Sequence, residues 1–387
     1  MGGSYEHVVI GGGPMGASAA AYLAERGKDV ALVAAGEGGA HGRYSSHGDV
    51  SRVARKWSND PVWAQLGRRS LSRFRDIESS TGVSFFTDVG SLLVVAEDAA
   101  AQHRSLEQVL AGPDSDSFEH LSCAQLRHRF SYLNVGDGSV GVLEPTAAGY
   151  FDPRAFVTAQ IRRGQRRGLT HIEAPMEDLG TANGGGHLIT LADGGSIHGQ
   201  HVLLAVGAYS RFESWSPVAH DLTVFGRTII HVEVEDGLRR SLRGMPSVRL
   251  HGASHGYYMV PPMQYPDGRW YLKIGGGPRT EVLASKTALQ QWCAGEGDPA
   301  VAEMLLAKAQ EVIPDLVAVD VRPQTCIITV PPGGHPYITR GDTGIGVLTG
   351  GNGAGAKSGD ELGRLAAAMM SGEPDWAEDY GDGVFEP

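Results

Sequence analysis

Cysteine is scarce in this sequence of 387 residues. Its three cysteines, Cys123, Cys293 and Cys326, are widely spaced, and no Cys-x-x-Cys pair occurs. An odd number at such spacings argues against a disulfide framework and against a zinc site. The histidines show no metal-ligand spacing either, so we expect no bound metal. At most one cysteine is expected to take part in chemistry.

Long apolar runs and an excess of positive charge are also missing. No stretch approaches the roughly 20 apolar residues of a membrane span. The N-terminus has no basic region followed by an apolar run, so we expect neither a signal peptide nor membrane association, and a cytoplasmic location. The net charge of −11 argues against nucleic acid as a partner, because binding phosphate backbones needs a clustered basic surface. An anionic cofactor stays compatible, since backbone N–H groups at a helix N-terminus can hold its phosphates.

Glycine, by contrast, is abundant, with 55 residues, about twice the average usage. The surplus fits tight turns and close backbone approaches to a ligand. A hydrophobic content of 41% and a charged content of 20% are ordinary for a globular enzyme. The length favours two structural domains or one elaborated α/β domain.

The N-terminal pattern predicts a βαβ unit. A β-rich run at 7–10 precedes the hexapeptide 11–16 (Gly-Gly-Gly-Pro-Met-Gly), and an alanine-rich helix at 17–26 leads to a strand at 29–33. In a G-x-G-x-x-G turn the first glycine permits the tight turn and the second lets the backbone approach a pyrophosphate. The third allows close helix–strand packing. An ordinary glycine turn is the alternative, but the strand before and the helix after favour a dinucleotide site.

Further elements follow from the same patterns. Helices are expected at 61–82, 123–129, 152–168, 300–312 and 359–370, strands at 89–95, 201–206 and 345–348, and β-rich blocks at 222–235 and 257–274. The acid that usually binds the ribose after the second strand is replaced by Ala34 and Ala35. Glu37 is the next acid, so we expect this contact from Glu37 or from backbone groups.

Six sequence blocks occur in a fixed order along the chain. They lie at 45–55 (Ser-Ser-His-Gly-Asp-Val-Ser-Arg-Val-Ala-Arg), 89–95, 143–149 (Leu-Glu-Pro-Thr-Ala-Ala-Gly), 205–209, 322–326 and 351–357. Together they resemble the flavoprotein family typified by D-amino-acid oxidase, in its monomeric sarcosine oxidase and N-methyltryptophan oxidase branch. The resemblance implies FAD as cofactor, hydride transfer from an amine-bearing carbon to flavin N5, and reoxidation by O2 to hydrogen peroxide.

The resemblance also implies the fold class, α/β with an α+β second domain. A Rossmann-type FAD-binding domain would be assembled from the discontinuous segments 1–82, 146–215 and 320–387. A mostly antiparallel sheet domain for the substrate would comprise 83–145 and 216–319.

A set of residues is expected to bind the cofactor. It comprises Gly11, Gly13, Pro14, Met15, Gly16, Glu37, Ser46, His47, Arg52, Met176, Gly207, Cys326, Gly351, Gly353, Gly355 and Lys357. The resemblance aligns Cys326 with a cysteine that attaches covalently to the flavin ring through a thioether. The alternative is a buried small hydrophobe, as most free cysteines are.

Lys273 and Arg52 are assigned catalytic roles by the resemblance. Lys273 aligns with a lysine over the flavin that assists O2 reduction, because a fixed cation stabilises the developing negative charge. The alternative is a solvent-facing lysine on a strand. Arg52 aligns with an arginine near the flavin that would stabilise negative charge on the reduced ring.

Arg55 and Lys357 align with a pair that holds a substrate carboxylate, to which an arginine offers a planar fork and a lysine a point charge. Exposed surface charges are the alternative. Tyr258 aligns with a tyrosine of the substrate pocket, although aromatic residues in strands are more often core.

Two departures from the branch concern specificity. Ala354 and Gly277 stand where the branch places histidines, which predicts a larger or more apolar pocket and argues against sarcosine itself as the substrate. His251 and His255 lie near Gly277 in sequence and are candidates to compensate.

The sequence therefore predicts an FAD-dependent oxidase of a C–N bond. The expected substrate is a secondary or cyclic amine or amino acid, carrying a carboxylate, with O2 as second substrate and a monomer or small homo-oligomer as the assembly. Alternatives are a dehydrogenase with another acceptor, a hydroxy-acid oxidase, a flavin-dependent tailoring enzyme of a biosynthetic pathway, and an FAD-binding non-catalytic subunit. A plain NAD dehydrogenase would give the blocks around Cys326 and Lys357 no role.

Overall fold

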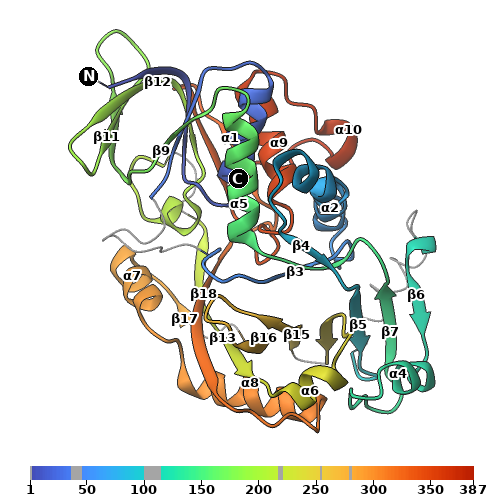
Figure 1. The fold of residues 1–387 in the computed structure, drawn as a ribbon. Coiled ribbons are helices and arrows are strands. Elements are labelled where there is room, and N and C mark those ends of the chain that lie inside the picture. The colour runs from blue at the N-terminus through green and yellow to red at the C-terminus, as the bar shows by residue number, and fades with distance from the viewer. Residues whose placement is uncertain (1, 36–45, 100–114, 217–220, 253–254, 279–280) are drawn as a thin grey trace.

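The computed structural model describes residues 2–35, 46–99, 115–216, 221–252, 255–278 and 281–387. Figure 1 shows an upper region, with one sheet and a group of helices, above a second sheet that has α8 (Pro299–Val312) beneath it. None of the described helices is long and apolar enough to cross a membrane.

The first sheet has a parallel centre. Five strands run parallel: β1 (Ser4–Ile10), β2 (Val30–Val33), β9 (Thr170–Ile172), β12 (Ser196–Leu204) and β20 (Ile345–Thr349). Three antiparallel strands extend it: β10 (Met176–Thr181), β11 (His187–Leu191) and β19 (Tyr337–Arg340). Because parallel strands share a direction, the carboxyl ends of β1, β2, β12 and β20 meet at one edge, where doubly wound folds bind ligands.

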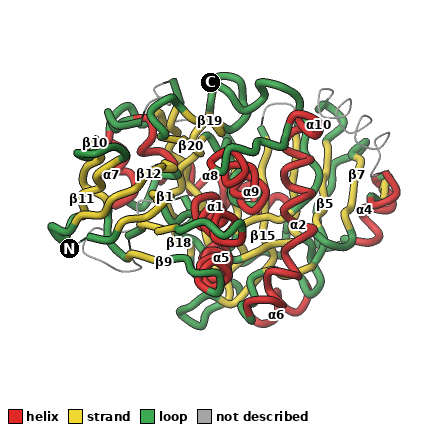
Figure 2. Tube along the Cα trace, turned by 90° about the horizontal axis from the view of Figure 1, so that it is seen from above, coloured by secondary structure: helices red, strands yellow, loops and turns green. Residues whose placement is uncertain are grey.

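Four helices group together beside this sheet: α1 (Pro14–Glu25), α2 (Pro61–Thr81), α5 (Pro153–Gln165) and α9 (Gly359–Met370) (Figure 2). Glycine lets α9 lie close to α1, because a Cβ on Gly363 would come within 2.4 Å of the Ser18 Cβ. Asp360 and Glu361 on α9 are fully buried, and Arg73 of α2 pairs with both, at 2.5 and 2.6 Å.

The second sheet is mostly antiparallel, with strand order β17-β13-β16-β15-β14-β5-β7-β6 and β18 paired to β13. Its strands are β5 (Ser91–Val95), β6 (Glu119–Leu121), β7 (Val140–Glu144), β13 (Thr223–Glu233), β14 (Ser247–His251), β15 (Gly256–Gln264), β16 (Trp270–Gly276), β17 (Glu281–Val282) and β18 (Val321–Val330). A small third sheet joins β3 (Arg52–Ala54), β4 (Phe86–Asp88) and β8 (Gly149–Phe151). The other helices of the described residues are α4 (Cys123–Arg129), α6 (Asp236–Ser241), α7 (Lys286–Ala294) and α10 (Ala377–Tyr380), with short 3₁₀ turns at Ser115–Ser117 and Gly207–Arg211.

One face of the second sheet is sealed by α8. Ile230 on β13 and Leu272 on β16 belong to the same apolar core as Leu305 of α8. Side chains alternate along a strand, so the residues between these core positions point to the opposite face. The strand pairings His231 with Lys273, Arg227 with Cys326, Tyr258 with Gly275 and Arg249 with Tyr258 put all of these residues on that opposite face.

The predicted fold class is confirmed, and the βαβ unit is present as β1, α1 and β2. The helix expected at 61–82 is α2, and the one expected at 359–370 is α9. The β-rich block 257–274 forms two strands, β15 and β16, separated by a turn with Gly268 at φ +82°. The division into domains stays a prediction.

Replacing Gly16 by alanine is expected to destabilise the fold, whereas replacing Gly13 is not. A Cβ on Gly16 would lie 1.9 Å from the Gly11 carbonyl oxygen, but one on Gly13 would meet only the His47 ring, at 3.6 Å. Overpacking typically costs about 1–3 kcal/mol, and a backbone clash puts Gly16→Ala at the upper end of that range. Urea unfolding measures the difference, and equal stability of the two variants would contradict this packing.

Candidate active site

A cavity of about 1460 Å³ lies between the carboxyl ends of the first sheet's parallel strands and one face of the second sheet. Ile10, Val33 and Thr349 line it from the first sheet, and Tyr258 and Cys326 from the second. Its volume exceeds the roughly 300–1,000 Å³ of pockets for drug-sized ligands. It has room for a dinucleotide together with a small substrate.

The glycine turn forms one wall of the cavity. Gly11 has φ +108°, and a Cβ there would lie 2.3 Å from the Ala205 carbonyl oxygen, so this position requires glycine. Space is open in front of Gly13, and no side chain caps the N-terminus of α1 behind it. Backbone N–H groups at an uncapped helix N-terminus attract anions. The turn thus fits a diphosphate group.

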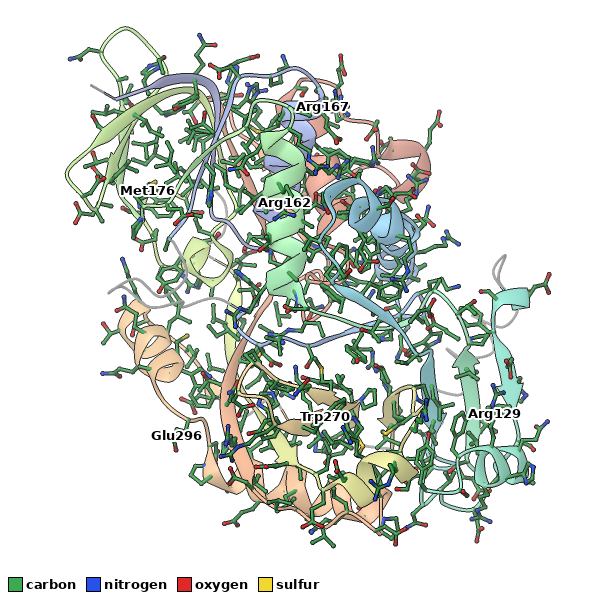
Figure 3. All side chains as sticks on the ribbon, viewed as in Figure 1. Arg129, Arg162, Arg167, Met176, Trp270 and Glu296 are labelled. Atoms are coloured by element: carbon green, nitrogen blue, oxygen red, sulfur yellow. The ribbon has the colours of Figure 1, made fainter. Side chains whose placement is uncertain are left out.

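All described residues of the predicted cofactor set line this cavity. Glu37 lies outside the described residues, while Ala34 and Ala35 line the wall near it. Met176, at the start of β10, lies in the upper region, far from Trp270 on the second sheet (Figure 3). The individual contacts of these residues with FAD stay predictions.

Lys273 belongs to a buried ionic cluster around Asp49. Its ammonium pairs with the Asp49 carboxylate and donates to the Ser51 carbonyl oxygen at 2.7 Å. Arg52 pairs with the same carboxylate at 3.1 Å, and the Tyr265 hydroxyl donates to it at 3.2 Å. With 1% of its surface exposed, Lys273 is not the solvent-facing residue of the alternative interpretation. It lies behind the cavity wall that Arg52 helps to form.

This cluster retains positive charge. Burial alone raises the pKa of Asp49, but the charges of Lys273 and Arg52 and the His231 ring, whose Nε2 lies 3.3 Å from the carboxylate, hold it well below its usual range. Burial lowers the pKa of Lys273 to about 8 against the attraction of Asp49. At neutral pH Lys273 and Arg52 together face one carboxylate. One positive charge is therefore left over, near Cys326.

Lys357 and Arg55 line another part of the wall. Lys357 is 4% exposed, and its ammonium makes one long hydrogen bond, 3.4 Å, to the Trp63 carbonyl oxygen. Burial lowers its pKa to about 8. Arg55 has a buried Nη1 with no hydrogen-bond partner. Neither residue is an exposed surface charge, and both keep donors free for a ligand.

Glu144 fixes the segment that carries Arg55. Its buried carboxylate accepts hydrogen bonds from the backbone N–H groups of Lys56, at 2.7 Å, and Trp57, at 3.1 Å. Burial raises the pKa of Glu144 against these bonds. Glu144 therefore works as a clamp on the backbone, and it also acts electrostatically on Lys357.

Several residues of the site were not assigned from the sequence. Asp49 and Glu144 stood inside two recognised blocks without a role, and Trp57 and Arg249 were not singled out. A signal for Arg249 existed, because Ser247, Arg249 and His251 alternate with the apolar Val248 and Leu250, which puts Arg249 on the polar face of a strand.

The positions that depart from the branch lie around the cavity. His251 lines it, whereas His255 is exposed and does not. Gly277 and Ala354, which stand where the branch places histidines, both line the wall. Within the described residues no group of three His, Cys, Asp or Glu side chains is arranged to hold a metal ion.

Comparisons with known proteins agree with these features. The sequence model of the FAD dependent oxidoreductase family (DAO) matches residues 6–369. Monomeric sarcosine oxidase of Streptomyces avermitilis is 34% identical over 177 residues, covering 46% of this chain and 45% of that protein. The aligned part therefore spans less than half the length of that relative. Monomeric sarcosine oxidase of Bacillus sp. (strain NS-129) is 22% identical over 276 residues, covering 70% of this chain and 68% of that protein.

Solved structures share the architecture. L-proline dehydrogenase from P. horikoshii superposes with a TM-score of 0.76 at 17% identity, covering 99% of this chain and 97% of the other. At this identity the likeness shows the fold alone. The family resemblance expected from the sequence is confirmed by the family match. With a glycine turn and helix N-terminus that fit the cofactor's diphosphate, and with that match over nearly the whole sequence, this chain belongs to the FAD dependent oxidoreductase family.

Proposed function

We propose that this protein oxidises a C–N bond in an amino acid or amine that carries a carboxylate, using FAD and passing the electrons to O2. The observation that carries the proposal is the pair Arg55 and Lys357. Both cations line the cavity, and neither has a carboxylate at ion-pair distance among the described residues. Burying unpaired charge is costly, so a carboxylate ligand supplies what the site lacks.

The relatives support this substrate class. Sarcosine and L-proline, named in two of them, are both secondary amino acids with one carboxylate. Gly277 and Ala354 leave more room than the histidines of the branch. We therefore expect a substrate larger than sarcosine.

Each part of the chain has a task in such a reaction. FAD, when bound, supplies the hydride acceptor and the route of electrons to O2. Arg55 and Lys357 hold the carboxylate, and this fixes the direction of the substrate's reacting C–H bond. A neutral amine can release hydride without a general base, so the task of the protein is orientation and electrostatics. The leftover positive charge of Lys273 and Arg52 supports O2 as acceptor, because it stabilises developing negative charge.

Peroxide release tests the proposed function. Purified protein loaded with FAD is expected to produce hydrogen peroxide with secondary or cyclic amino acids, and not with the corresponding 2-hydroxy acids. Lys357→Met should raise KM more than it lowers kcat, because it removes a charge that contacts the carboxylate before and during the reaction. Peroxide release from hydroxy acids alone would contradict the proposal. Turnover only with an artificial electron acceptor would support C–N oxidation and contradict the role of O2 as the electron acceptor.

Cys326 is proposed to carry the flavin covalently. Its thiol lines the cavity together with the other described residues of the predicted cofactor set, Arg52 among them. Acid precipitation of the protein should leave the yellow colour in the pellet, and Cys326→Ser should release it. Cys293→Ser is the matched control, because burial raises the pKa of Cys293 to about 11 and keeps that thiol protonated. Wild-type flavin found in the supernatant would exclude the linkage.

Lys273→Met is expected to slow the reaction of the reduced protein with O2 on the order of 100-fold, because only the neutral pair of Arg52 and Asp49 remains. A lysine is charged below its pKa, which is about 8 here, so the wild-type rate constant should fall as pH rises through about 8. The variant should show no such fall. Asp49→Asn removes the carboxylate that raises this pKa, and should move the fall to lower pH. Stopped-flow reoxidation measures these rates, and an unchanged rate in Lys273→Met would contradict the role.

A further inference from the structure

Arg249 is a further cation on the cavity wall, near Lys357. It lies on β14 opposite Tyr258 of β15, on the face of the second sheet that is turned away from α8. Arg249, Arg55 and Lys357 all line the same cavity. Arg249 also acts electrostatically on Lys357 and disfavours its charged form, which places the two cations near each other.

The charge of Arg249 is not balanced by a carboxylate in the described part of the chain. Its Nη2 donates to His251 Nε2 at 2.9 Å, and its buried Nε has no partner. A guanidinium group only donates, so this ring nitrogen of His251 must accept. Burial lowers the pKa of His251 to about 4, with Arg249 adding to the effect, so the ring is neutral near pH 7. His251 therefore orients Arg249 without neutralising it.

Trp57 connects the two arginines. The guanidinium carbon of Arg55 lies 5.2 Å from the centroid of the Trp57 ring, and that of Arg249 lies 5.6 Å from it. Cation–π contact supports each charge but removes neither. The indole Nε1 of Trp57 is buried and has no hydrogen-bond partner either. The ring thus lies beside two separate guanidinium groups, each with an unused donor.

The balance of charges around Lys357 distinguishes a substrate with one anionic group from a substrate with two. Arg55, Arg249 and Lys357 are three cations, and Glu144 is the carboxylate that acts on Lys357. Both Glu144 oxygens already accept backbone N–H bonds. A substrate with one carboxylate leaves one positive charge uncompensated in the cavity, whereas a second anionic group balances it.

We infer that Arg249, oriented by His251 and flanked by Trp57, is a second anion subsite, and that the substrate is an amino acid with two carboxylates or a comparable second anion. The inference rests on the proposed function, because Arg55 and Lys357 must hold the first carboxylate.

Binding of two unreactive acids of equal length tests the inference without turnover. Butyrate and succinate both have four carbons, and succinate has the second carboxylate. Isothermal titration calorimetry on the FAD-loaded protein should give a dissociation constant for succinate at least about tenfold lower than for butyrate, since a hydrogen bond to a charged group is worth that much or more. Equal affinities would overturn the inference and leave the first carboxylate site intact.

The variant Arg249→Met should abolish the preference for succinate and leave the affinity for butyrate within about threefold. Methionine keeps apolar bulk and removes a buried charge without a carboxylate partner, so the fold should persist. Arg322→Met is the control, because Arg322 pairs with Asp267 and Asp320 at an exposed site outside the cavity. It should leave both affinities unchanged.

Other outcomes separate the two proposals. If Arg249→Met weakens the binding of butyrate and of succinate equally, Arg249 belongs to the first carboxylate site and the inference is wrong. If neither acid binds the FAD-loaded wild type, the role of Arg55 and Lys357 fails, and the inference fails with it. If Arg249→Met does not fold, the wild-type ratio of the two affinities still decides.

Discussion

Side chains of the second sheet point alternately to α8 and to the opposite face, and Arg227, Arg249 and Lys273 all lie on that opposite face. Ile230 and Leu272 complete an apolar core against α8. Lys273 is the next residue after Leu272, so it must face the other way, toward Asp49. A shift of one residue in the register of β16 would bury its lysine against α8 and expose a leucine in the site. The core under the sheet therefore holds the site together as much as the site's own hydrogen bonds do.

Buried cations in such a site need anions. Asp49 meets part of this need for Lys273 and Arg52, and its depressed pKa keeps it ionised. Around Arg55, Arg249 and Lys357 the chain supplies less negative charge than positive charge. In our account the deficit is met by the substrate, which makes the cost of burying these cations part of substrate recognition. The same groups are held in place before any ligand arrives, as Glu144 shows by fixing the backbone beside Arg55.

Local signals in the sequence were enough for part of this picture. The glycine turn, the βαβ unit and α2 depend on neighbouring residues, and the structure has them where the pattern predicts them. The cluster around Asp49 depends on contacts such as the one with Lys273, 224 residues away, which no local pattern encodes. The family blocks in the sequence predicted Arg52, Arg55 and Lys357 individually as site residues. The packing of Arg249 and Arg55 against the same Trp57 ring shows that Arg249 belongs beside them.

The most direct test of the account is the visible absorption of the FAD-loaded protein, mixed without oxygen with a secondary amino acid that has two carboxylates, and then exposed to air. We expect the flavin band to fall in the absence of oxygen and to return when air is admitted. The flavin band should fall at lower concentrations of the amino acid with two carboxylates than of an analogue that has one carboxylate. A band that stays unchanged with every carboxylate-bearing amine, although FAD is bound, would contradict the assignment of this cavity to C–N oxidation.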